Sequence, residues 1–208
     1  ILGSCDQANI KVTHCSNHGN IEGNSGSGFH GVGGIAGVMG YDPGATQKGD
    51  NLEVYSCANY GLVEASNSWV GGILGYQEEG KTGKNDTNSI VKDCVNYGEI
   101  AKNLGSGGGI VGRIDNYANQ HRCINFGKVY TGDALVDDEK NAAITHQHDL
   151  YYLNSSGNDS WGESFTESEQ NKQSTFSGFD FNTVWKLDSG DSRPTLRQCA
   201  FQFATLPN

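Results

Sequence analysis

The alternation of apolar and polar positions recurs along roughly the first two thirds of the chain. Apolar residues two apart, such as Ile10 with Val12 and Leu52 with Val54, predict short β-strands. Two polar residues then interrupt the alternation, so we expect a bend there. After each bend comes the motif Cys-x-Asn-x-Gly-x-(Ile/Val), in which Asn-x-Gly is typical of a turn. The motif occurs four times and begins at Cys15, Cys57, Cys94 and Cys123.

A second motif, Gly-Gly-Ile-x-Gly, follows the first three copies and occupies residues 33–37, 71–75 and 108–112. The chain opens on a remnant of it, Ile1-Leu2-Gly3, so we expect this sequence to be part of a longer protein with flanking domains. Several short strands repeated at a near-constant period indicate a stacked repeat architecture. We therefore predict an all-β fold: a parallel β-helix, or β-solenoid, of about three to four coils. By analogy with crossovers between parallel strands, we expect it to be right-handed.

Equivalent side chains of successive coils should form columns, because neighbouring strands lie roughly 4.8 Å apart. The motif cysteines are expected to line the core. The motif asparagines are expected to form a hydrogen-bonded ladder of Asn17, Asn59, Asn96 and Asn125. The residues that follow them are expected to form an outward ladder of rings: His18, Tyr60, Tyr97 and Phe126.

The fourth repeat lacks a Gly-Gly motif, so we expect the regular stack to end near residue 135. This divides the chain into solenoid repeats (1–140) and an aromatic-rich C-terminal segment (141–208). Stacked repeats need an atypical element over the last open core, and we expect the second part to be that cap. Residues 188–191 indicate a hairpin-type turn within it.

Composition narrows the classes of function. The 208 residues carry a formal net charge of −10, which disfavours binding to nucleic acid. No apolar run is long enough to span a bilayer. Four of the six cysteines share one repeat position, which favours small buried residues; a disulfide or a metal site is the alternative. Cys5 and Cys199 lie outside this register and have no predicted role.

Together the two motifs resemble the GLUG repeats of bacterial surface proteins. The resemblance covers roughly residues 1–132, and the ending with Arg193-Pro194-Thr-Leu196 is similar to segments that close such arrays. It implies an extracellular or cell-surface location, an adhesin-like role, and kinship with repeats beside the catalytic region of IgA-cleaving zinc peptidases. The His-Glu-x-x-His signature of those peptidases is absent from this chain.

Candidate chemistry is sparse. On a strand, His146 and His148 would share one side and offer two metal ligands, but no third ligand is in view and we favour a polar loop. The acidic run at residues 137–139, expected in a loop, would be solvated or would bind calcium. No carboxylate recurs in adjacent repeats and no nucleophile elbow is present, so we predict no catalytic residue, no metal site and no cofactor.

The ring ladder is the most informative surface feature, because flat rings can receive a sugar face or a partner's side chains. We take His18, Tyr60, Tyr97, Phe126 and Trp69 as candidate binding residues, the last in a loop together with Trp161. The alternative, which we favour for the rings themselves, is that they serve only to stabilise the stack. We expect a non-enzymatic adhesion or scaffold module that binds a host glycan or glycoprotein. The alternative is a carbohydrate-active β-helix enzyme or a substrate-recognition module of an IgA-peptidase-like protein.

Overall fold

The fold is built from short, mostly parallel β-strands. A computed structural model describes residues 2–5, 10–24, 30–39, 52–77, 89–115, 118–140 and 147–197. Apart from one 3-10 turn, η2 (Gln173–Thr175), the regular elements in these ranges are strands, which confirms the all-β class. His146 and Cys199 lie outside the described residues, as do most of the Gly- and Ser-rich connections.

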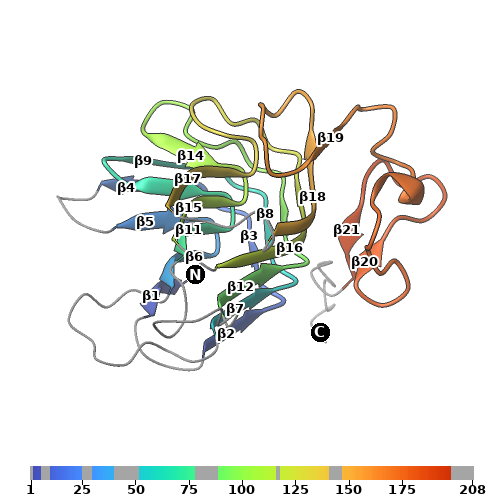
Figure 1. The fold of residues 1–208 in the computed structure, drawn as a ribbon, viewed down its shortest axis with the longest axis horizontal. Helices are drawn as coiled ribbons and strands as arrows, with labels where there is room; N and C mark the ends of the chain where they lie inside the picture. Colours follow the sequence, from blue (N-terminus) through green and yellow to red (C-terminus); the bar gives the residue numbers. More distant parts are fainter. Residues whose placement is uncertain are drawn as a thin grey trace, which may run out of the picture.

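Each sequence repeat contributes one layer of strands, and Figure 1 shows successive layers side by side. Strand β1 (Leu2–Cys5) precedes the first layer. The first layer comprises β2 (Ile10–Thr13), β3 (Ser16–Asn17), β4 (Ile21–Asn24), β5 (Gly31–Gly33) and β6 (Ala36–Met39). The second comprises β7 (Leu52–Tyr55), β8 (Ala58–Asn59), β9 (Val63–Ser66), β10 (Trp69–Gly71) and β11 (Leu74–Gln77). The third comprises β12 (Ser89–Lys92), β13 (Val95–Asn96), β14 (Ser106–Gly108) and β15 (Val111–Asp115).

The later layers have fewer and longer strands. The fourth contains β16 (Asn119–Asn125) and β17 (Val136–Lys140). The fifth contains β18 (Gln147–Leu153), against which β19 (Glu163–Phe165) pairs. A short antiparallel pair, β20 (Trp185–Lys186) and β21 (Thr195–Leu196), follows, and the turn expected at residues 188–191 connects its strands.

Strands of successive layers pair in parallel with the motifs in register. Asn17 lies opposite Asn59, Asn59 opposite Asn96, and Asn96 opposite Asn125. The Gly-Gly strands pair in the same way, with Gly33 opposite Gly71 and Gly71 opposite Gly108. Every equivalent side chain therefore belongs to a column that runs across the layers.

The predicted bend is present immediately before each motif cysteine. The residue there adopts the left-handed backbone region, which is uncommon outside glycine, with φ between 49° and 55°. The four positions are His14, Ser56, Asp93 and Arg122, and Asp149 adopts the same conformation before Leu150, which takes the place of the cysteine in the fifth layer. Because the bend reverses the alternation of faces, the cysteine that follows points into the core.

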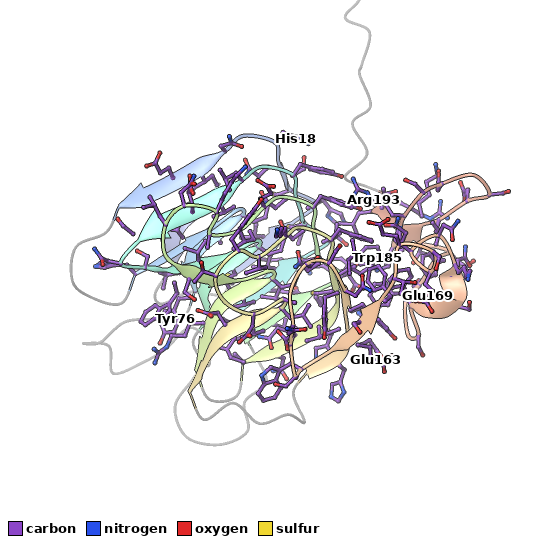
Figure 2. The ribbon with its side chains drawn as sticks, turned by 90° about the horizontal axis from the view of Figure 1, so that it is seen from above. His18, Tyr76, Glu163, Glu169, Trp185 and Arg193 are labelled. Carbon is purple, nitrogen blue, oxygen red and sulfur yellow. The ribbon has the colours of Figure 1, made fainter. Side chains whose placement is uncertain are left out.

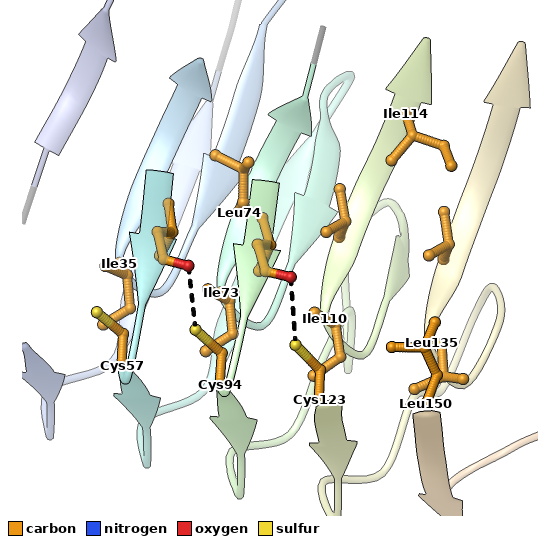
Figure 3. Close-up of a cluster of buried hydrophobic side chains, with 14 of the residues drawn as sticks. Ile35, Cys57, Ile73, Leu74, Cys94, Ile110, Ile114, Cys123, Leu135 and Leu150 are labelled. Carbon is orange, nitrogen blue, oxygen red and sulfur yellow. Dashed lines mark hydrogen bonds between the residues drawn. The ribbon is translucent and has the colours of Figure 1, made fainter. Parts of the chain in front are cut away.

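The cysteine column forms one wall of the core (Figure 3). Cys57, Cys94 and Cys123 are fully buried, and Cys15 in the first layer is half-buried. All four are free thiols, and burial raises the pKa of the Cys94 thiol well above its usual value. Isoleucines of the second motif pack on the opposite wall: Ile35, Ile73 and Ile110.

The expectation that the stack ends near residue 135 is wrong. Strand β17 pairs in parallel with β15, and β18 pairs in parallel with β16 beyond the expected boundary at residue 140. In this fifth layer Leu150 takes the place opposite Cys123, and Tyr152 takes the place opposite Asn125. The run at residues 137–139 accordingly lies in strand β17 and not in a loop.

The aromatic C-terminal segment lies beside the stack, whereas we expected it over the end (Figure 1). Trp185, Phe176 and Leu196 pack on the outward side chains of β8, β13, β16 and β18. These outward residues are the x of Cys-x-Asn, and they form a column: Ala58, Val95, Ile124 and, in the fifth layer, Tyr151. Residues 156–159, between β18 and β19, belong to the fifth layer, because their carbonyl and carboxylate oxygens accept the amides of Val129, Ala134 and Leu135 in the fourth.

Candidate functional site: a column of stacked rings

The asparagine ladder fixes the turn from which the rings project. The side-chain amide of Asn17 donates to Asn59 Oδ1, that of Asn59 to Asn96 and that of Asn96 to Asn125, each over 2.8 Å. Each asparagine also donates to the carbonyl of the motif glycine two residues on, and Asn17, Asn96 and Asn125 accept the amide of that glycine as well. The side-chain amide is thus fixed both by its own turn and by the neighbouring asparagines. The residue that follows the asparagine therefore projects from the same place in each layer.

The rings that follow the asparagines stack face to face. Centroids are 4.5 Å apart between His18 and Tyr60, 4.8 Å between Tyr60 and Tyr97, and 5.3 Å between Tyr97 and Phe126. The interplanar angles of 10° to 16° and these spacings fall in the range of favourable aromatic contacts. The predicted ladder is therefore present, and its spacing follows that of the strands beneath it.

Exposure along the ring column is uneven, so part of the predicted binding face is unavailable. His18 is exposed and Tyr60 is 36% exposed, whereas Phe126 is buried at 7%. The edge of Phe165 packs against Phe126 at 5.4 Å. Phe126 is therefore a packing residue, and the accessible rings are those of the first layers.

Arg193 defines where the open part of the column ends. Its guanidinium lies 4.4 Å from the centroid of Tyr97 and 5.5 Å from that of Phe126, which is a cation–π geometry. The hydroxyl of Tyr97 donates to the carbonyl of Pro194. Figure 2 shows His18 and Arg193 on the same side of the molecule. The column thus offers two stacked rings followed by a cationic side chain.

Trp69 belongs to a separate cluster and not to the ring column. It lies in strand β10, where a loop was expected, with its ring centroid 5.1 Å from that of Tyr76. Arg113 from the third layer lies 4.4 Å above the Trp69 ring. This partner could not be predicted from the repeat pattern, because Arg113 follows its Gly-Gly-Ile-x-Gly motif at a position that is apolar or aromatic in the other layers.

The acidic and histidine candidates have ordinary structural surroundings. Asp137 accepts a hydrogen bond of 3.0 Å from Ser106 Oγ. His148 stacks on His121 at 5.1 Å, and burial, followed by His148 and Arg122, lowers the pKa of His121 to about 4. Among the described residues there is no group of three or more His, Cys, Asp or Glu side chains that could hold a metal.

A partly buried ion pair between two layers of the stack, which we did not predict, contacts the C-terminal segment through Trp185. Arg122 donates two hydrogen bonds of 2.7 Å to Asp93, which is 2% exposed. Trp185 Nε1 donates a third, over 3.2 Å, to the same carboxylate. Asp93 and Arg122 are the residues before two motif cysteines, so their shared register position was the available signal.

A polar pocket of about 390 Å³ lies where β18 and β19 meet the C-terminal segment, and Glu163, Glu169 and Lys172 line part of it. The carboxylate of Glu169 accepts bonds from the Thr166 hydroxyl and amide, which lower the pKa of Glu169. This carboxylate therefore closes a turn.

No helix among the described residues is long and apolar enough to cross a bilayer. Comparison of the chain with protein-family models, curated proteins and solved structures gave no match. The resemblance to GLUG repeats accordingly stays a prediction from the sequence motifs.

Proposed function

We propose that the chain is a non-enzymatic adhesion or scaffold module of a bacterial cell-surface or secreted protein, and that its layers are coils of a right-handed β-solenoid. The parallel, in-register pairing in several sheets supports the solenoid. The handedness rests on the general preference of crossovers between parallel strands. The continuous ladders support a role that requires rigidity.

The ligand we propose is a glycan or glycoprotein carbohydrate, received on the rings of His18 and Tyr60. The observation that carries this proposal is the stack of parallel rings that remains accessible at one end of the column. A sugar presents an apolar face of C–H groups, which would pack on the exposed ring of His18 and along the edge of Tyr60, whose faces are covered by His18 and Tyr97. Arg193, at the covered end, would orient a polar or acidic group of the same ligand.

The test is binding of the purified protein to an array of host glycans and mucosal glycoproteins, with and without calcium. Tyr60→Ala should weaken any reproducible signal at least about fivefold, since a lost aromatic contact at a binding site is worth more than about 1 kcal/mol. Tyr130→Ala is the matched control, because Tyr130 is similarly exposed at 40% but lies off the column beside Lys102 and Lys128.

Two outcomes would count against the glycan proposal. If the array is silent, the module is a scaffold and the rings serve only the stack. If Tyr60→Ala and Tyr130→Ala weaken binding equally while both variants retain the wild-type melting profile, the ligand binds elsewhere on the surface.

A further inference from the structure

Strands of the first layer lie at the edges of three sheets among the described residues. Strands β2, β3, β4 and β5 are terminal in their sheets, and β1 is the terminal strand next to β6. Beside these edges lies an apolar groove lined in part by Ile21, Val32 and glycines of β1, β5 and β6. The sheet edge and the apolar groove both continue the interface that joins each layer to the next.

Gly19, at this end of the stack, is the motif glycine where no close contact among the described residues requires the absence of a side chain. At Gly61, Gly98 and Gly127, an added Cβ would lie 2.0, 1.9 and 1.8 Å from the carbonyl oxygen of the motif glycine one layer before. Gly19 holds the same motif position in the first layer, and its nearest neighbour would be Asn17 Oδ1 at 3.9 Å. A glycine at position 19 would therefore be needed only if another layer packed in front of it, and the described residues contain no such layer.

Two hydrogen-bonding groups at this end show the same pattern. Asn59 Oδ1 accepts the amide of the asparagine before it, whereas within the described chain Asn17 Oδ1 accepts only the Gly19 amide. The backbone amides of Ala58 and Val95 donate to the carbonyl of the preceding motif cysteine over 2.9 and 3.0 Å. Ser16 is their equivalent, and no described layer presents a cysteine carbonyl to it.

We propose that this edge binds one further coil of the same repeat type, a segment that carries Cys-x-Asn-x-Gly-x-(Ile/Val) in parallel register. Its asparagine would donate to Asn17 Oδ1, its cysteine carbonyl would accept the Ser16 amide, and its glycine carbonyl would lie against Gly19. Strand β1 already occupies one strand position of that coil, because Leu2 and Leu74 both lie opposite Ala36. The residue after its asparagine would lie against His18, so this coil and the proposed glycan would compete for that ring.

A second copy of this protein does not fit as the occupant. Its last described layer is the fifth, in which Leu150 and Tyr152 hold the positions of the motif cysteine and asparagine. Tyr152 stands where an asparagine would be needed to donate to Asn17. A head-to-tail stack of copies would thus lack the ladder contact.

The test is a fusion protein in which residues 52–72 are placed directly in front of Ile1 of the full chain. The junction keeps register, because Ile1-Leu2-Gly3 aligns with Ile73-Leu74-Gly75. We expect the fusion to raise the urea midpoint and to slow hydrogen exchange of the Ser16 amide at least about tenfold. A fusion with the same 21 added residues in scrambled order is the control and should do neither.

Gly19→Ala tests whether a gain in stability of the fusion comes from the proposed contact at Gly19 or merely from the added residues. In the unfused protein the change should leave the urea midpoint within error, because the site is open. In the fusion it should remove the gain, as the new coil's glycine carbonyl would occupy the position of the added methyl. An unchanged midpoint in the fusion, or equal effects of Gly19→Ala with and without it, would overturn the proposal. So would concentration-dependent dimerisation of the unfused protein that Gly19→Ala abolishes, because a second copy would then be the occupant.

Discussion

Replacing Asn96 by alanine tests the ladder where it is most deeply buried. The Asn96 side chain is fully buried and takes part in four hydrogen bonds: two with Gly98, one from Asn59 and one to Asn125. A protein hydrogen bond contributes roughly 1 kcal/mol net, and buried partners left unpaired add to the loss. We therefore expect Asn96→Ala to lower the free energy of unfolding by at least about 4 kcal/mol.

Asn17→Ala is the matched control for Asn96→Ala. Asn17 makes the same two bonds with Gly19 and donates to Asn59, but it lies at the exposed end, where water can replace the lost partners. We expect that variant to lose only about 1 kcal/mol. Both values can be measured by urea unfolding with linear extrapolation. Equal losses in the two variants, or a loss below about 1 kcal/mol for Asn96→Ala, would refute the reasoning that the ladder stabilises the stack through buried amides.

Three further predictions follow from other contacts. Gly127→Ala should destabilise by at least about 2 kcal/mol in the same unfolding assay, because its Cβ would lie 1.8 Å from the Gly98 carbonyl oxygen; no loss would contradict the close approach of the two turns. Trp185→Phe keeps most of the packing but removes the bond to Asp93, so we expect a loss of about 2 kcal/mol, and a neutral result would show that the indole N–H is unimportant. Burial lowers the pKa of His121 to about 4 from its ordinary 6.5, so the unfolded state binds the proton more readily between these values. Stability should be full above about pH 6.5 and fall towards pH 4, and the His121→Gln variant should show a smaller fall; identical pH profiles would contradict the assignment.

The columns of the stack could be predicted because each depends on one residue type at one motif position. Asparagine at the turn has two donors and two acceptor sites, so a parallel neighbour with the same residue satisfies it. The polar pair before each cysteine interrupts the alternation of apolar and polar residues, which predicted a bend. The structure has this bend, and its second residue, such as His14 or Ser56, adopts the left-handed backbone conformation.

The fifth layer could not be recognised from the motif, because its key residues differ in type. Asn125 donates to the carbonyl of Ala134, so the ladder ends and Tyr152 can replace an asparagine. Leu150 fills the cysteine position with a larger side chain in the same core. Backbone pairing persists without the motif, because hydrogen bonds between strands require no particular side chain.

The position of the C-terminal segment was mispredicted, although the sequence contains a signal for it. Along the x position of Cys-x-Asn the side chains become larger and more apolar from layer to layer, through Ser16, Ala58, Val95 and Ile124. Outward residues of a solvated face have no reason to become apolar, so the trend indicates a partner that covers the later layers. The burial of Phe126 follows from the same cover.

The central structural claim is that the repeats stack in parallel register through their asparagines, and side-chain amide NMR tests it most directly. The account predicts slow hydrogen exchange for the side-chain amides of Asn59 and Asn96, with nuclear Overhauser effects between the two, since each donates over 2.8 Å to the asparagine of the next layer. Side-chain amides that exchange at the rate of a free asparagine and show no contact between repeats would contradict it.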